Sequence, residues 1–141
     1  MIVLTEENQT TIKKDISLKG VGLHTGKEVN LTFKPAVANS GYTFTRIDLK
    51  GKPLIEANIN YVFNTDRGTC LNKDNVKIQT CEHVLAALVG LEIDNVNIEL
   101  DASEPPIMDG SSKFFVEALE IAGKKDLQEK RKEFVVRDII T

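Results

Sequence analysis

The sequence predicts an α+β fold, and three of its features lead to this prediction. Two segments, residues 29–35 (VNLTFKP) and 96–100 (VNIEL), alternate apolar and polar side chains, which is typical of strands with one buried face. Two others, residues 81–91 and 112–123, have the apolar spacing of amphipathic helices. Strand-like and helix-like segments also alternate along the chain. The two helices are therefore expected to lie on a sheet.

The strands can be assigned in order. The residues expected on the buried faces of the two stronger strands are Val29, Leu31, Phe33, Val96, Ile98 and Leu100. Weaker strands are expected at residues 10–18, 42–48, 68–71 and 76–79. Clusters of Gly, Pro, Asn and Asp predict turns at residues 39–41, 50–53 and 72–75.

The first helix is expected to begin with Thr80 as its N-cap and to run through Leu91. The second is expected to begin with either Asp109 or Ser111 as its cap and to end at Gly123. The residues that it should bury are Phe114, Phe115, Ala118, Leu119 and Ala122.

The charge run at residues 123–133 (GKKDLQEKRKE) is expected to be a solvated connector before a last strand, FVVRDII, which has no partner after it. The predicted division is therefore a first domain at residues 1–125 and a connector with a first strand at 126–141. That strand would lead to a missing second domain, so the chain is expected to be a fragment.

Composition excludes several classes of protein. The length of 141 residues and the 41% hydrophobic content suit one domain with a real core. The net charge of −3, with Lys and Arg dispersed, disfavours nucleic-acid binding. No apolar run approaches the roughly 20 residues of a membrane span, and the initial MIVL is too short for a signal peptide, so a cytoplasmic location is expected. Without secretory context, Cys70 and Cys81 are expected to be free thiols rather than a pair.

Glu82 and His83 are the strongest candidates for chemistry. If Thr80 caps the helix, both lie in its first turn, where the partial positive charge favours a carboxylate and a neutral imidazole. One side chain could bind a metal while its neighbour acts as a general base. The alternative is ordinary helix-dipole chemistry beside a partly buried histidine. Ala86 and Ala87 exclude a second histidine one turn on, so either no zinc binds or further ligands lie beyond Thr141.

Two loops are candidates for binding sites. In KGVGLHTGKE, residues 19–28, the glycines miss the dinucleotide-binding spacing, and Lys27 is followed by Glu28 where a phosphate-binding loop needs Ser or Thr. A turn between two strands explains these glycines but not His24, whose side chain would project from the tip. The second loop, ASEPPIMDGSS, is stiffened by two prolines and is expected to be structural.

Three motifs in this order carry a resemblance to a known family: GVGLHTG (20–26), TCEHVLAALVGLEIDN (80–95) and EPPIMDGSS (104–112). They closely resemble the amino-terminal half of UDP-3-O-acyl-N-acetylglucosamine deacetylases, zinc amidases of bacterial lipid A biosynthesis. The resemblance implies a two-layer α/β sandwich with a mostly antiparallel sheet of about five strands and two helices on one face, similar to domains of ribosomal proteins. It also implies an active site between this domain and a second, related one.

The same resemblance implies roles for three residues. His83 matches a zinc ligand, Glu82 matches the general base, and His24 matches a residue near the cleft that would bind substrate. The other zinc ligands are expected in the missing second domain. The expected partners are therefore UDP-3-O-acyl-N-acetylglucosamine and that domain, with no nucleic acid and no membrane span. The isolated fragment is expected to be inactive and to self-associate weakly; the alternative function is a non-catalytic binding module of ribosomal-protein-like fold.

Overall fold

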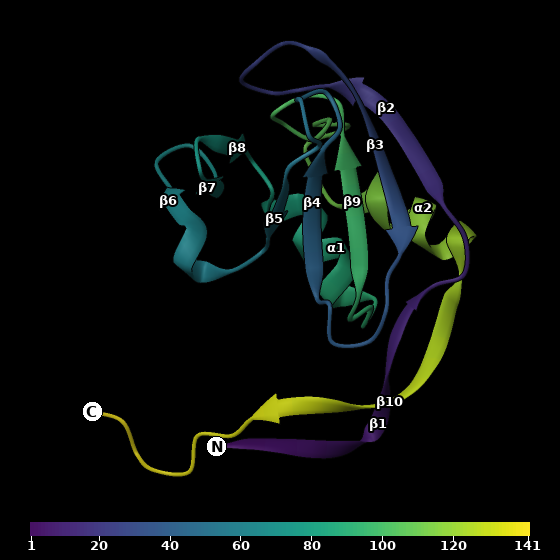
Figure 1. Ribbon diagram of the computed structural model, residues 1–141, viewed down its shortest axis with the longest axis vertical. Helices are drawn as coiled ribbons and strands as arrows, with labels where there is room; N and C mark the ends of the chain where they lie inside the picture. Colours follow the sequence, from purple (N-terminus) through teal and green to yellow (C-terminus); the bar gives the residue numbers. More distant parts are fainter.

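The computed structural model describes residues 1–141, and its centre is a five-stranded sheet covered on one face by two helices (Figure 1). The strands in spatial order are β2 (Ile16–Val21), β3 (Glu28–Pro35), β9 (Val96–Leu100), β4 (Tyr42–Arg46) and β5 (Leu54–Glu56). All neighbours are antiparallel except β4 and β9, which are parallel. The predicted two-layer sandwich is thus confirmed.

The two helices, α1 (Glu82–Gly90) and α2 (Lys113–Ala122), enclose the core together with the sheet. The alternating residues predicted for β3 and β9 are all buried, and Phe33 meets Phe115 of α2 edge to face with ring centroids 6.4 Å apart. Phe114 was expected in the core but is 37% exposed, because it lies about 100° around the helix from Phe115. No helix of the structure has the length and hydrophobicity needed to cross a membrane.

A smaller sheet lies beside the main one and leads into α1. Its strands are β6 (Val62–Asn64), β7 (Cys70–Lys73) and β8 (Val76–Ile78), preceded by the short 3-10 helix η1 (Ile59–Tyr61). Arg46 of β4 joins the two sheets, because its Nη1 donates to the carbonyl oxygen of Lys77 at 2.9 Å. Its Nη2 pairs with Asp48 at 2.8 Å, which lowers the pKa of that carboxyl group. Strand β8, which precedes α1, is therefore held to the main sheet.

The two ends of the chain form an antiparallel ribbon of β1 (Ile2–Ile12) and β10 (Lys124–Phe134), which extends away from the sandwich (Figure 1). The prediction of a connector at residues 123–133 is therefore wrong, although its side chains are mostly solvated as expected. Alternation is absent because neither face of β10 is buried, whereas backbone pairing with β1 needs no apolar side chains. The strand expected after it is also wrong, since only Phe134 of that segment belongs to a strand.

The single strand expected at residues 10–18 is in fact two strands, because the chain bends between β1 and β2 at residues 13–15. The division of the chain at residues 125 and 126 stays a prediction.

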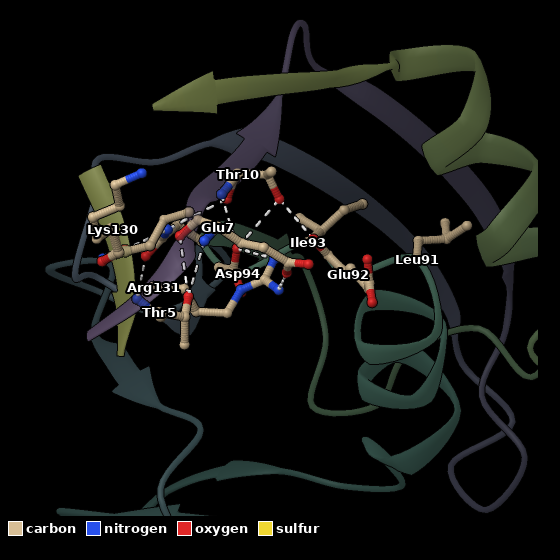
Figure 2. A network of polar contacts seen from close by, with 12 residues as sticks. Thr5, Glu7, Thr10, Leu91, Glu92, Ile93, Asp94, Lys130 and Arg131 are labelled. Atoms are coloured by element: carbon tan, nitrogen blue, oxygen red, sulfur yellow. Dashed lines mark hydrogen bonds and ion pairs between the residues drawn. The ribbon is translucent and has the colours of Figure 1, made fainter. Parts of the chain in front are cut away.

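Polar contacts attach the ribbon to the end of α1 (Figure 2). Asp94 Oδ2 accepts the backbone N–H of Thr10 at 2.8 Å, and both Asp94 oxygens accept from the guanidinium group of Arg131 at 3.0 and 3.1 Å. Arg131 also pairs with Glu7 at 2.6 Å. Asp94 therefore connects β1, β10 and the segment that follows α1, instead of bonding to its own backbone in a turn.

Replacing Asp94 by Ala is expected to lower the free energy of unfolding by about 1–3 kcal/mol, because Thr10 N–H and Arg131 lose a shared acceptor. Urea unfolding followed by circular dichroism measures the change. The control is Asp15→Ala, which removes a carboxylate that is 59% exposed and 3.9 Å from its partner Lys34. Equal stability of the two variants would contradict the role assigned to Asp94.

Candidate active site at the start of the first helix

Helix α1 begins one residue later than predicted. Its N-cap is Cys81, so Glu82 and His83 are the first two helical residues, and no side chain caps the helix. The predicted cap, Thr80, has a left-handed backbone with φ of 51°. Its hydroxyl donates to Glu104 Oε1 at 3.1 Å instead of accepting from the helix. The Thr80 hydroxyl therefore bonds to a residue distant in the sequence instead of capping the helix.

The carboxylate of Glu82 is oriented by the segment before β7. Its Oε2 accepts the backbone N–H of Thr69 at 3.0 Å, whereas no hydrogen bond within the chain involves Oε1. Gly68 makes this approach possible: a Cβ there would lie 3.1 Å from Glu82 Oε1, and the φ of 151° disfavours other residues. Glu82 is only half-buried, so its second oxygen remains available to a ligand.

His83 is half-buried, and no hydrogen bond within the chain involves its ring nitrogens. Its carbonyl oxygen accepts the hydroxyl of Ser112 at 2.8 Å, which ties α1 to the start of α2. Ser112 is the N-cap residue of α2, so neither predicted cap is right. Asp109 accepts from the backbone N–H and hydroxyl of Ser111, at 2.9 and 2.7 Å, within the preceding turn.

His24 lies on the loop that joins β2 to β3, as predicted, and its side chain is exposed. Its Nε2 lies 3.1 Å from the carbonyl oxygen of Arg67, which comes just before Gly68. A surface pocket of about 300 Å³ opens here. Its lining residues are His24, Asn64, Asp66, Arg67, Cys70, Gln79 and Thr80. The loop that carries His24 and the residue Thr80, two positions before α1, thus border the same pocket.

Glu104 is a buried residue of this site that the sequence analysis missed. It is 1% exposed and accepts the backbone N–H groups of His24 and Thr25, in addition to the hydroxyl of Thr80. No hydrogen bond joins His24 to Glu82 or His83 directly. Glu104 joins the His24 backbone to Thr80, two residues before Glu82, and the backbone of residues 67–69 bonds to both the His24 ring and the Glu82 carboxylate. Sequence offered only a weak signal, an acidic residue before two prolines.

Burial alone would raise the pKa of Glu104, but the hydrogen bonds from His24, Thr25 and Thr80 outweigh it and lower the pKa below the usual 4.5. A carboxyl group whose pKa is lower in the folded protein stabilises the fold above the unfolded pKa. This contribution is lost as the pH falls through the folded pKa.

The stability difference between the unaltered protein and Glu104→Gln should therefore shrink as the pH falls below about 4.5. Protonated glutamate and glutamine are both neutral, so the charged form no longer favours folding. Urea midpoints of the two proteins across a pH series measure this difference. A difference that stays constant down to acid pH would show that the charge of Glu104 does not stabilise the fold.

The two cysteines are free thiols, as expected. Cys70 is half-buried, and burial raises the pKa of the fully buried Cys81 thiol to about 12. Nowhere does the structure gather three or more His, Cys, Asp or Glu side chains into a group that could hold a metal ion.

A family model described as LpxC, UDP-3-O-acyl N-acetylglycosamine deacetylase, matches residues 9–141 of the chain. The chain belongs to this family.

Three curated relatives illustrate the similarity to known LpxC proteins. The bifunctional enzyme LpxC/FabZ of Chlorobaculum tepidum is 49% identical over 133 residues, which are 94% of this chain and 28% of that protein. The UDP-3-O-acyl-N-acetylglucosamine deacetylase of Idiomarina loihiensis is 49% identical over 90% of this chain and 42% of its own length. That of Wigglesworthia glossinidia brevipalpis is 46% identical, with 94% and 45% covered. The chain thus spans less than half of each relative.

Proposed function

We propose that the chain is the amino-terminal part of a zinc-dependent deacetylase that hydrolyses the 2-acetamido group of UDP-3-O-acyl-N-acetylglucosamine in lipid A biosynthesis. In a chain of the LpxC family, one observation supports this proposal most directly. Glu82, with one carboxylate oxygen bound to Thr69 N–H and the other free, stands beside His83, whose ring makes no hydrogen bond. This is an acceptor next to an available metal ligand.

The donor set fits part of a zinc site. A half-buried imidazole with both ring nitrogens available is a normal zinc ligand, and Ser112 fixes the backbone that carries it. One imidazole does not make a catalytic site, which usually has three protein ligands. The remaining ligands are therefore proposed to come from a second domain of the same protein.

When bound, zinc supplies a Lewis acid that polarises the amide carbonyl and makes a water molecule more acidic. Glu82 is proposed to accept the proton of the attacking water at Oε1, while the hydrogen bond from Thr69 N–H keeps Oε2 in place. His24, exposed at the edge of the pocket, is proposed to bind the substrate. A cytoplasmic location and the lack of a nucleic-acid partner belong to this proposal.

The test uses the full-length protein, in which this chain is followed by the second domain. It is expected to release acetate from UDP-3-O-acyl-N-acetylglucosamine, to lose this activity with a chelator and to regain it with zinc. Absence of acetate release from the zinc-loaded protein would refute the proposal and leave the alternative, a non-catalytic binding module.

The isolated 141-residue chain is expected to show no deacetylation and to bind zinc weakly, because it contributes a single imidazole. Val89 and Ile121, on the outer sides of α1 and α2, are each 64% exposed and should promote weak self-association. Calorimetric zinc titration and sedimentation across a concentration series measure both effects. Sub-micromolar zinc binding that His83→Ala abolishes, or a strictly monomeric chain, would contradict the respective expectation.

A further inference from the structure

We propose that Glu104 is a positioning residue that holds the His24 loop and the start of α1 in a fixed relation, so that substrate-binding and catalytic groups form one site. The inference rests on the proposed function for the roles of His24 and Glu82. The contacts of Glu104 itself do not depend on that function.

The carboxylate of Glu104 connects three separate segments. Its Oε1 accepts His24 N–H at 3.0 Å and the Thr80 hydroxyl at 3.1 Å, and its Oε2 accepts Thr25 N–H at 2.9 Å. These donors come from the loop between β2 and β3 and from the residue that precedes Cys81, the N-cap of α1. Glu104 lies on the loop between β9 and α2, so one side chain joins three loops at one end of the sandwich.

The buried carboxylate of Glu104 would be unstable without its hydrogen bonds. Glu104 is 1% exposed, yet none of the ion pairs of the chain includes it. A buried carboxylate without a cation is stable only when fixed donors replace its water. The three donors therefore determine the position of Glu104, and Glu104 in turn determines theirs.

The surrounding backbone leaves the carboxylate little freedom. A Cβ at Gly22 would lie 2.8 Å from Glu104 Oε2 and would also clash with Thr25 Oγ1, so only glycine allows this approach. A Cβ at Gly20 would lie 2.8 Å from Cβ of Pro106, which is buried like Pro105. The end of β2, which leads into the loop, is thus packed directly against a segment that two prolines stiffen.

Thr80 transmits the position of Glu104 to Glu82. A Cβ at Gly68 would lie 3.4 Å from Thr80 Oγ1 and 3.1 Å from Glu82 Oε1, so both groups border the same side of Gly68. A left-handed conformation is unfavourable for a β-branched residue, and the hydrogen bond to Glu104 opposes relaxation of Thr80. Without this bond, Thr80 and then Glu82 are expected to shift.

Three variants distinguish the bond from Glu104 to Thr80, before α1, from the bonds between Glu104 and the His24 loop. Thr80→Val has nearly the same shape but lacks the hydroxyl, so it disconnects α1 and leaves the His24 loop bound. Glu104→Ala disconnects both. Glu104→Gln can keep both, because its amide oxygen at the position of Oε2 can accept from Thr25 N–H and from His24 N–H, which lies 3.1 Å from Oε2, while its amide nitrogen donates to the Thr80 hydroxyl. Asp94→Ala is the control, since Asp94 also accepts a threonine N–H but lies at the other end of α1.

Steady-state kinetics of the full-length protein distinguish positioning from a general loss of stability. Thr80→Val is expected to lower kcat about tenfold or more with KM nearly unchanged, because a small displacement of the base costs rate. Glu104→Ala is expected to lower kcat and also raise KM, and Glu104→Gln should restore most of both. Asp94→Ala should leave both constants unchanged below its unfolding temperature. Unchanged kinetics in Glu104→Ala, or a change in KM alone in Thr80→Val, would overturn the proposal.

Nuclear magnetic resonance of the full-length protein labelled with ¹⁵N-threonine tests the proposal without an activity assay. Thr25, Thr69 and Thr10 each donate a backbone N–H to a different carboxylate, those of Glu104, Glu82 and Asp94. Thr80→Val should shift the Thr69 amide resonance and speed its hydrogen exchange without affecting Thr10, and Asp94→Ala should do the reverse. A Thr69 amide that Thr80→Val leaves unaltered would refute the link to Glu82. If the unaltered protein lacks deacetylase activity, the proposed function fails, while these amides still decide the role of Glu104.

Discussion

Glu82→Gln in the full-length protein is expected to lower turnover by roughly 10² to 10⁴-fold while zinc remains bound. Glutamine preserves the shape of the side chain, and its carbonyl oxygen can still accept Thr69 N–H at the position of Oε2. The amide group cannot accept the proton of the attacking water, so the loss falls on the chemical step.

His83→Ala is expected to remove zinc as well as activity, because it deletes a ligand rather than a base. Elemental analysis of both purified variants, beside acetate-release assays, measures the two effects separately. Glu120→Gln, an exposed change on α2, is the matched control and should keep both zinc and turnover. Full zinc occupancy in the His83 variant would refute its assignment as a ligand, and normal turnover in Glu82→Gln would refute the general base.

Phe33→Ala is expected to lower the free energy of unfolding by about 3–5 kcal/mol. Phe33 is completely buried on β3, between β2 and β9, and its ring packs edge to face on Phe115. The truncation therefore loses the burial of a ring, leaves a cavity at the contact between sheet and helices, and removes an aromatic pair.

Urea unfolding measures this loss, and Phe134→Ala provides the comparison. Phe134 is 74% exposed at the end of the ribbon, so its removal should cost less than about 1 kcal/mol. Similar losses in the two variants would mean that the contact between β3 and α2 is not the centre of the core.

Periodicity predicted those parts of the fold that have one buried face. β3, β9 and both helices repeat apolar residues at strand or helix spacing, and the structure places them as expected. β5 and β6 have three residues each, too few for a repeat to be visible. Neither face of β10 is buried, so no pattern distinguishes it from a connector.

The sequence indicated the pair Glu82 and His83 but not Glu104, because the contacts of Glu104 are far apart in the sequence. Glu82 and His83 are neighbours in the chain, so helix geometry alone suggested joint chemistry. Glu104 contacts donors that lie 80, 79 and 24 positions away in the sequence, and a single sequence carries no record of such contacts. The same contact explains why the capping prediction for Thr80 failed, since the hydroxyl is already used.

The ribbon of β1 and β10 has a consequence for the order in which the chain folds. Its last hydrogen bonds join Met1 to Val135, 134 positions apart, so the ribbon closes a loop that contains nearly the whole chain. Closing a long loop costs more entropy than closing a short one, whereas β2 and β3 are joined by six residues. The ribbon buries little apolar surface to offset that cost. During synthesis on the ribosome, the five-stranded sheet and α1 can form before β10 is made, and β10 pairs with β1 only afterwards.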